Sequence, residues 1–181
     1  GASFVQGFRP SMEDAHVTAE VKETHLLAVF DGHGGSCVAE LAARVLKARV
    51  EEEWPFSSHQ TLPAAAEAVR RALLRVEEEL AELNISKKSI ECIGSTAACL
   101  TVDAKNITSC WLGDTRAVVA SQDNYGVPLS YDHKPTEAGE RQRIFASGGT
   151  VFRGRVNGAL AVSRALGDYC YKKENLNPLV S

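Results

Sequence analysis

The first part of the chain alternates between apolar and polar positions over short stretches. Residues 26–30 form a bounded run of large apolar side chains, which predicts a buried strand. Residues 17–21 alternate and predict a second strand, and residues 2–8 alternate weakly and predict a third. The apolar run stops abruptly at Asp31-Gly32-His33-Gly34-Gly35. We therefore expect polar groups at the end of a rigid strand, where they can be held in place and still reach solvent.

Two amphipathic helices are predicted next. Ser36 is a suitable N-cap for the first, which should end before Pro55. The second should begin near Pro63, because proline favours the first helical turn. Apolar residues recur at helical spacing in both, at Val38, Leu41, Ala42 and Val45 and then at Ala65, Val69, Leu73, Val76, Leu80 and Leu83. The charged residues within the second stripe are expected on a solvated face: Arg70, Arg71, Arg75, Glu77 and Glu78.

Beyond Glu91 the pattern changes to short strands joined by turns. Three strands are predicted, over residues 95–102, 107–112 and 117–121. A further helix should be capped by Thr136 and run to Ala146, before Gly148-Gly149. Strands grouped in a meander, with helices in pairs, indicate an α+β layered sandwich.

The overall composition is that of an ordinary globular domain. The 181 residues can bury a full core, and the net charge of −3 gives no electrostatic footprint for nucleic acid or an anionic membrane. No apolar run approaches the ~20 residues that span a bilayer. These properties exclude nucleic acid and membrane as expected partners.

The cysteines bear on the compartment. There are five, scattered and without a Cys-x-x-Cys pair, at Cys37, Cys92, Cys99, Cys110 and Cys170. Neither a zinc site nor a redox motif is supported, and we expect free thiols in a reducing compartment, cytoplasmic or nuclear. Because the chain does not begin with Met, a targeting segment upstream of Gly1 stays open.

Four acids lie beside turns or strand ends: Glu13, Asp14, Asp31 and Asp114. Carboxylates without an accompanying Cys and His set favour a hard cation such as Mg²⁺ or Mn²⁺ over zinc. A phosphate-binding loop would need Gly-Lys-Ser/Thr, and no lysine follows these glycines. An aspartyl nucleophile would be expected to have a second acid two residues on, where His33 stands. A metal ligand with a neighbouring acid–base histidine remains.

These residues resemble a known family. Arg9-x-x-Met12-Glu13-Asp14-x-His16 followed by Phe30-Asp31-Gly32-His33-Gly34-Gly35 is similar to the metal-dependent protein serine/threonine phosphatases of type 2C. Five further segments agree in order: Gly94-Ser95-Thr96-Ala97, Leu112-Gly113-Asp114-Thr115-Arg116, Asp132-His133-Lys134-Pro135, Gly148-Gly149, and the run from Val156 to Asp168. The match covers nearly all of the chain, and it predicts that residues 1–181 are the N-terminal two-thirds of one catalytic domain.

The resemblance implies a four-layer α-β-β-α sandwich of two antiparallel sheets flanked by helix pairs, incomplete at the C-terminus. It implies hydrolysis of phosphoserine and phosphothreonine in phosphoprotein substrates. The nucleophile would be a water activated by two Mn²⁺ or Mg²⁺ ions, with a third metal bound more weakly.

The resemblance also implies roles for single residues. His33 would be the general acid, and Arg9 would hold the substrate phosphate. The metal ligands would be Asp31 as the bridge, the Gly32 carbonyl, Glu13 with Asp14 in a supporting role, and Asp114 for the third metal. His16 and Asp168 are expected to be structural, and residues 132–154 to form a flap beside the site.

Two later aspartate ligands of the family have no counterpart in this sequence. Its one Asp-Gly pair is Asp31-Gly32, and Asp123-Asn124 lies in an early turn. We expect unpaired sheet edges and exposed apolar surface, covered by a strand-paired dimer or by a complementary C-terminal segment. A non-catalytic regulatory or binding module (a pseudophosphatase) and an inactive fragment stay open as alternatives to an enzyme.

Overall fold

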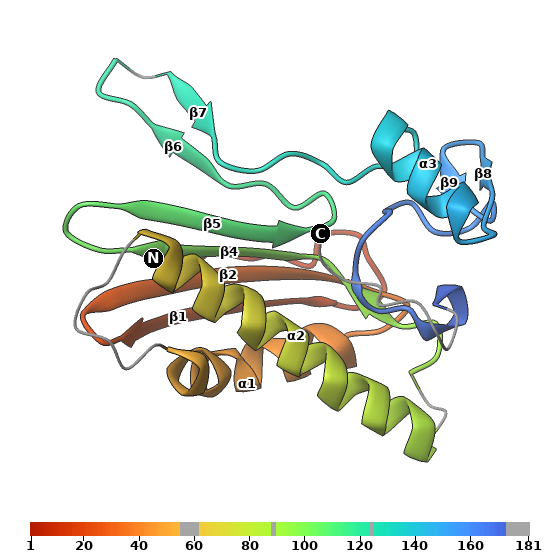
Figure 1. The fold of residues 1–181 in the computed structure, drawn as a ribbon, viewed down its shortest axis with the longest axis horizontal. Coiled ribbons are helices and arrows are strands. Elements are labelled where there is room, and N and C mark those ends of the chain that lie inside the picture. Colours follow the sequence, from red (N-terminus) through yellow and green to blue (C-terminus); the bar gives the residue numbers. More distant parts are fainter. Residues whose placement is uncertain (55–61, 88–89, 124, 173–181) are drawn as a thin grey trace.

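The computed structural model describes residues 1–54, 62–87, 90–123 and 125–172 (Figure 1). The first elements along the chain are β1 (Asp14–Val21), β2 (Thr24–His33), α1 (Cys37–Glu53), α2 (Leu62–Lys87), β3 (Gly94–Ser95), β4 (Ala97–Val102) and β5 (Ile107–Leu112). The later ones are β6 (Val118–Ala120), β7 (Gly126–Pro128), α3 (Ala138–Ala146), β8 (Val151–Phe152), β9 (Arg155–Val156), β10 (Leu166–Gly167) and the 3₁₀ helix η1 (Tyr169–Tyr171). The predicted α+β class is confirmed.

A six-stranded antiparallel sheet forms the centre of the molecule. Its strands run in the order β10-β3-β2-β4-β5, and β1 also pairs with β2. β1 and β2 form a hairpin whose turn residues Lys22 and Glu23 have φ of 46° and 64°. Positive φ at both positions is what a tight two-residue hairpin requires. The resulting register places Asp14 opposite Asp31.

The strand predicted over residues 95–102 is split at Thr96, between β3 and β4. The Thr96 N–H donates to the Asp31 carbonyl at 2.9 Å, and Thr96 Oγ1 accepts from the Asp31 N–H at 3.1 Å. Thr96 thus satisfies both backbone groups of Asp31 where the regular ladder is interrupted. Beyond this point β2 pairs with β3, so that His33 lies opposite Gly94.

One face of the sheet is covered by α1 and α2 (Figure 1). Alternate residues of β2 are buried there, namely Leu26, Ala28 and Phe30, as the period of a strand requires. They pack with apolar residues of both helices, including Val38, Leu46, Val50, Ala72, Val76 and Leu80. On the opposite face Leu27 and Val29 are 37% and 46% exposed. Exposed apolar surface is therefore present, while the dimer and the complementary segment stay predictions.

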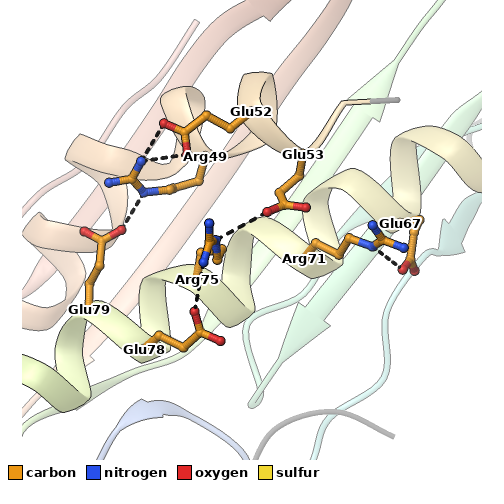
Figure 2. Close-up of polar contacts among 8 residues, drawn as sticks. All are labelled: Arg49, Glu52, Glu53, Glu67, Arg71, Arg75, Glu78 and Glu79. Carbon is orange, nitrogen blue, oxygen red and sulfur yellow. Dashed lines mark hydrogen bonds and ion pairs between the residues drawn. The ribbon is translucent and has the colours of Figure 1, made fainter. Parts of the chain in front are cut away.

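Ion pairs join the two helices along their outer faces. Figure 2 shows Arg49 of α1 against Glu79 of α2 at 2.5 Å, and Arg75 of α2 against Glu53 of α1 at 3.4 Å. These side chains are partly or largely exposed, so solvent screens each pair and its contribution to stability is small. The helix pair is held mainly by its buried apolar stripes.

The solvated face predicted for α2 is wrong at one position. Glu77 is only 5% exposed. Its carboxylate accepts the Gly167 N–H at 2.9 Å and Lys172 Nζ at 2.6 Å, because the segment after β10 crosses α2 there. The other four charged residues of that face are partly exposed or exposed.

Other expectations also need correction. Residues 2–8 form no strand, and Phe4, Val5 and Phe8 are exposed because no described strand pairs with this segment. The N-cap of α3 is Glu137 rather than Thr136, and its side chain makes no capping hydrogen bond.

The prediction of free thiols is wrong for two of the five cysteines. Cys92 and Cys170 form a disulfide across 78 positions of sequence, because the pairing of β10 with β3 brings their segments together. Cys37, Cys99 and Cys110 are free. A reducing compartment, cytoplasmic or nuclear, stays a prediction, with three free thiols instead of five behind it.

The remaining strands form two small ribbons. β6 pairs with β7, and β8 pairs with β9 close to α3 (Figure 1). Of the four predicted layers, the described residues form the large sheet and the helix pair that covers it, together with these ribbons and α3. Within the described ranges no helix has the length and apolar character needed to cross a membrane.

Candidate active site

The candidate site lies where β2 ends beside the start of β1. The β1–β2 register brings Asp14 opposite Asp31, and the Gly32 N–H donates to the Glu13 carbonyl at 3.2 Å. Residues from two different motifs of the sequence therefore meet at one end of the sheet. The hairpin, with one face packed on α1, holds them on a rigid frame.

Asp31 carries its carboxylate on the exposed side of β2, surrounded by other charges. Reduced hydration raises its pKa above the ordinary value, and the negative charges of Asp14 and Asp114 raise it further. His33 and Arg9 act in the opposite direction but do not cancel this effect. An excess of negative charge at Asp31 is an arrangement that a bound cation would relieve.

Gly32 is required by the close approach of β1. A Cβ at this position would lie less than 3.0 Å from the Glu13 carbonyl oxygen. Gly34 and Gly35 follow with φ of 73° and 143°, a region that favours glycine. These residues turn the chain sharply from β2 into α1, so three of the motif's residues are fixed by backbone geometry.

His33 is paired with a buried acid. Its Nε2 lies 2.7 Å from Asp168 Oδ2, and the two side chains are 30% and 3% exposed. Burial alone would lower the pKa of His33, but the hydrogen bond and charge of Asp168 outweigh burial and raise the pKa above its ordinary value. A histidine with a raised pKa keeps its proton at neutral pH more readily and can serve as an acid.

Asp114 follows β5 and lies close enough to Asp31 for its negative charge to raise the pKa of Asp31. Its carboxylate is ion-paired with Lys134. The preceding turn is fixed by His133, whose Nδ1 accepts the Gly113 N–H at 3.1 Å. Asp114 thus stands at the edge of the site, engaged by a lysine that a metal at this carboxylate would have to displace.

The two remaining candidates lie at the periphery. The Arg9 side chain is 75% exposed and is 3.9 Å from Glu13, a loose ion pair that leaves its guanidinium donors accessible. His16 packs its ring on Phe4 at a centroid distance of 5.4 Å. The structural role expected for His16 is consistent with this contact.

The site offers hard oxygen ligands but no closed metal cage. Across residues 1–54, 62–87, 90–123 and 125–172, no three His, Cys, Asp or Glu side chains are grouped closely enough to hold a metal ion by themselves. Asp31, with Asp14 across the hairpin, supplies carboxylates, and backbone carbonyls lie beside them. Mg²⁺ commonly takes one or two carboxylates and keeps several waters. The residues present fit a hard cation held partly by water.

Two contacts near the candidate site were not expected from the motifs. Asp168 was expected to be a structural turn residue, yet it contacts His33 from 135 positions away. Glu77, placed on a solvated face, holds the segment that carries Asp168. The sequence offers one sign of Asp168, since this acid ends the run that begins at Val156. No local pattern, however, connects Asp168 to His33.

Comparison with known proteins agrees over the whole chain. The family described as Protein phosphatase 2C matches residues 1–181. The human probable protein phosphatase 1N is 41% identical over 179 residues, 96% of this chain and 40% of that protein. Protein phosphatase 2C homolog 2 of Schizosaccharomyces pombe is 35% identical over 189 residues, 98% and 49% of the two chains. The chain spans less than half the length of these two relatives.

Solved structures share the fold. The structure of a C. elegans sex determining protein superposes with a TM-score of 0.81 at 27% identity, over 94% of this chain and 44% of that one. A phosphatase from a pathogenic strain of Toxoplasma gondii gives 0.75 at 25% identity, over 95% and 65%. With the motifs joined at one end of the sheet and the match extending from residue 1 to 181, the conclusion is direct: the chain belongs to the protein phosphatase 2C family.

Proposed function

We propose that the protein containing this chain hydrolyses phosphoserine and phosphothreonine in phosphoproteins, in a reaction that depends on Mn²⁺ or Mg²⁺. The observation that carries the proposal is the meeting of Asp31, surrounded by other acids, with a His33 that is backed by Asp168. One half of this arrangement attracts cations, and the other half can deliver a proton. Family membership supports the cation-binding half, because the protein phosphatase 2C family is metal-dependent.

In this proposal the Asp31 carboxylate and the Gly32 carbonyl hold the metal pair, with Glu13 and Asp14 beside them. Asp114, now ion-paired with Lys134, would be the carboxylate for a third, weaker metal. When bound, the metal ions supply a water of lowered pKa as the nucleophile. The charge repulsion at Asp31 is the physical reason for the affinity, because each acid near it makes a nearby cation more favourable.

Arg9 holds the substrate phosphate. Its guanidinium group offers a planar fork of donors that fits phosphate oxygens, and its exposed position suits a group that meets an incoming protein. The Arg9 charge acts on the pKa of Asp31, and the 3.9 Å contact with Glu13 leaves the guanidinium donors accessible.

His33 protonates the leaving oxygen. The alkoxide of serine or threonine is a poor leaving group, so a proton donor at this oxygen lowers the barrier substantially. The raised pKa of His33 increases the fraction of the ring that carries the needed proton at neutral pH. Asp31 and His33 are two residues apart on β2, so the cation site and the acid lie on adjacent parts of one strand.

A phosphate-release assay tests the proposal. The full-length protein would be incubated with a phosphothreonine peptide and Mn²⁺, with and without a chelator. We expect release that the chelator stops. Absence of release at any metal concentration, together with tight binding of the same peptide, would instead favour the non-catalytic binding module.

A further inference from the structure

Asp168 is an unusually placed acid for a turn. Asp168 is only 2% exposed, and its φ of 55° lies in the left-handed region of backbone conformation. It occupies the N-cap position of η1, where an aspartate ordinarily accepts a backbone N–H, yet its side chain makes no capping bond. The carboxylate is directed to His33 instead, with Nε2 to Oδ2 at 2.7 Å. A purely structural turn acid would use its oxygens locally.

The second carboxylate oxygen adds to this argument. Asp168 Oδ1 is buried and has no hydrogen-bond partner among the described residues. Leaving a buried carboxylate oxygen unpaired is costly, so the fold maintains this acid against an energetic preference for solvent. Such groups need an explanation, and the contact with His33 supplies one.

The segment that carries Asp168 is fixed from several sides. The Asp168 N–H donates to the Ile93 carbonyl at 2.9 Å, and the Cys170 N–H donates to the Glu91 carbonyl at 2.7 Å. On the other side, Glu77 of α2 accepts from Gly167 and Lys172, which flank Asp168 in sequence. The carboxylate therefore has a defined position relative to β3 and hence to the end of β2.

Gly94 leaves the space in which the two side chains meet. A Cβ there would lie less than 3.0 Å from both Asp168 Oδ2 and His33 Nε2. Gly94 of β3 lies opposite His33 of β2 on one side and opposite Gly167 of β10 on the other. Strand pairing and the absence of a side chain together produce the His33–Asp168 contact.

We propose that Asp168 is a positioning residue for the reaction: it accepts the Nε2–H of His33, fixes the ring, and leaves Nδ1 as the nitrogen that delivers the proton to the leaving oxygen. This rests on the proposed function, since it assigns a partner to the acid of that reaction. Of the two ring nitrogens, Nε2 is already engaged by Asp168, so the transferable proton is on Nδ1.

A double-mutant cycle on the full-length protein with Mn²⁺ tests the role. Asp168→Asn should lower turnover of a phosphothreonine peptide by about 100-fold, the lower end of what a general acid contributes. It should change turnover of an aryl phosphate with a good leaving group by less than about 3-fold, because that substrate needs little protonation. In a His33→Ala background the same substitution should have almost no effect on either substrate. Equal losses on both substrates, or the same loss in both backgrounds, would overturn the proposal.

A control variant distinguishes the positioning role of Asp168 from a folding defect, and a second measurement tests this role independently of phosphatase activity. Tyr169→Phe removes a partly buried hydrogen bond from the same segment to the Glu77 carbonyl, and it should leave the leaving-group dependence unchanged. Nitrogen-15 NMR of the unmutated protein, at a pH where the ring is neutral, should show His33 protonated on Nε2. That result supports the positioning role even if no phosphate is released, and a ring protonated on Nδ1 overturns it whatever the activity.

Discussion

Asp14 and Asp31 occupy opposite positions in the antiparallel β1–β2 hairpin. Two carboxylates placed directly across a strand pair repel, and such pairs destabilise a sheet. Asp114 adds a third negative charge, and the pKa of Asp31 is raised accordingly, with reduced hydration as the larger cause. The repulsion therefore lowers stability slightly, and a cation at the proposed metal site would relieve it.

Asp31→Asn should therefore separate function from stability. We expect the substitution to abolish metal-dependent turnover. Without metal, the free energy of unfolding should stay the same or rise by less than about 1 kcal/mol, because repulsion is relieved. The stabilisation that Mn²⁺ gives the unmutated protein should also disappear. Activity assays and thermal unfolding with and without Mn²⁺ measure these effects.

Asp123→Asn is the control for this experiment, since Asp123 lies exposed in a turn near the β6–β7 ribbon. It should change neither turnover nor the metal-induced stabilisation. If Asp31→Asn retained normal metal-dependent turnover, Asp31 would not be a metal ligand.

Gly94→Ala should break the His33–Asp168 contact while the fold survives. The added methyl group would meet the ends of two side chains rather than backbone, so the side chains should move apart. We expect slower turnover of a phosphothreonine peptide and nearly normal turnover of an activated aryl phosphate. Gly139→Ala in α3 is the control, because a Cβ there meets nothing within 4 Å and alanine favours the helix. An intact His33–Asp168 hydrogen bond with unchanged peptide turnover in Gly94→Ala would contradict this expectation.

The lowered pKa of Glu140 predicts that the protein loses stability in acid. Burial would raise its pKa, but hydrogen bonds from Arg164 and Arg143 hold the pKa at about 2. A group whose pKa is lowered on folding stabilises the protein above its unfolded value, near 4.5, and that contribution is lost as the pH falls toward 2. The 10% exposed side chain allows a loss of up to about 3 kcal/mol. Denaturant unfolding between pH 6 and about pH 3 measures the larger part of this loss.

Two variants define the Glu140 effect. Glu140→Gln should lower stability at pH 6 and flatten its pH dependence in acid. Glu67→Gln should have a much smaller effect that salt removes, although the pKa of Glu67 is also about 2, because its side chain is 41% exposed. An identical acid slope in Glu140→Gln and the unmutated protein would show that Glu140 is not responsible.

The Cys92–Cys170 disulfide should stabilise the fold by closing a long loop. The chain-entropy model gives about 4.5 kcal/mol for a loop of this size. Cys92→Ser should lower the free energy of unfolding under oxidising conditions, and the difference from the unmutated protein should vanish in excess reductant. Cys37→Ser, at an exposed free thiol, should behave as the unmutated protein in both conditions. Equal stability of Cys92→Ser and the oxidised protein would contradict the prediction.

Local patterns predicted the elements that carry their own signal. The helical spacing of Val69, Leu73 and Val76 predicted α2, and the abrupt end of an apolar strand at Asp31 indicated the candidate site. The contacts that the sequence did not predict involve groups whose partners are distant along the chain. Glu77 contacts a segment 90 positions away and Asp168 contacts His33 across 135.

Such contacts depend on how β10 returns to pair with β3, which periodicity and motif spacing do not encode. A charged residue within a helical stripe is usually solvated, so Glu77 could not be distinguished from Glu78 by sequence pattern. The same applies to the cysteines, because pairing is set by the folded distance between Cys92 and Cys170 and not by their spacing.

The most direct measurement of the central claim is phosphate release from a phosphothreonine peptide by the full-length protein in oxygen-18 water with Mn²⁺. We predict that the released phosphate carries one solvent oxygen, that a chelator stops the release, and that mass spectrometry detects no phosphorylated protein during turnover. A phosphorylated form of the protein that accumulates and decays with turnover, or no release at saturating Mn²⁺, would contradict the claim that a metal-dependent water reaction occurs at Asp31 and His33.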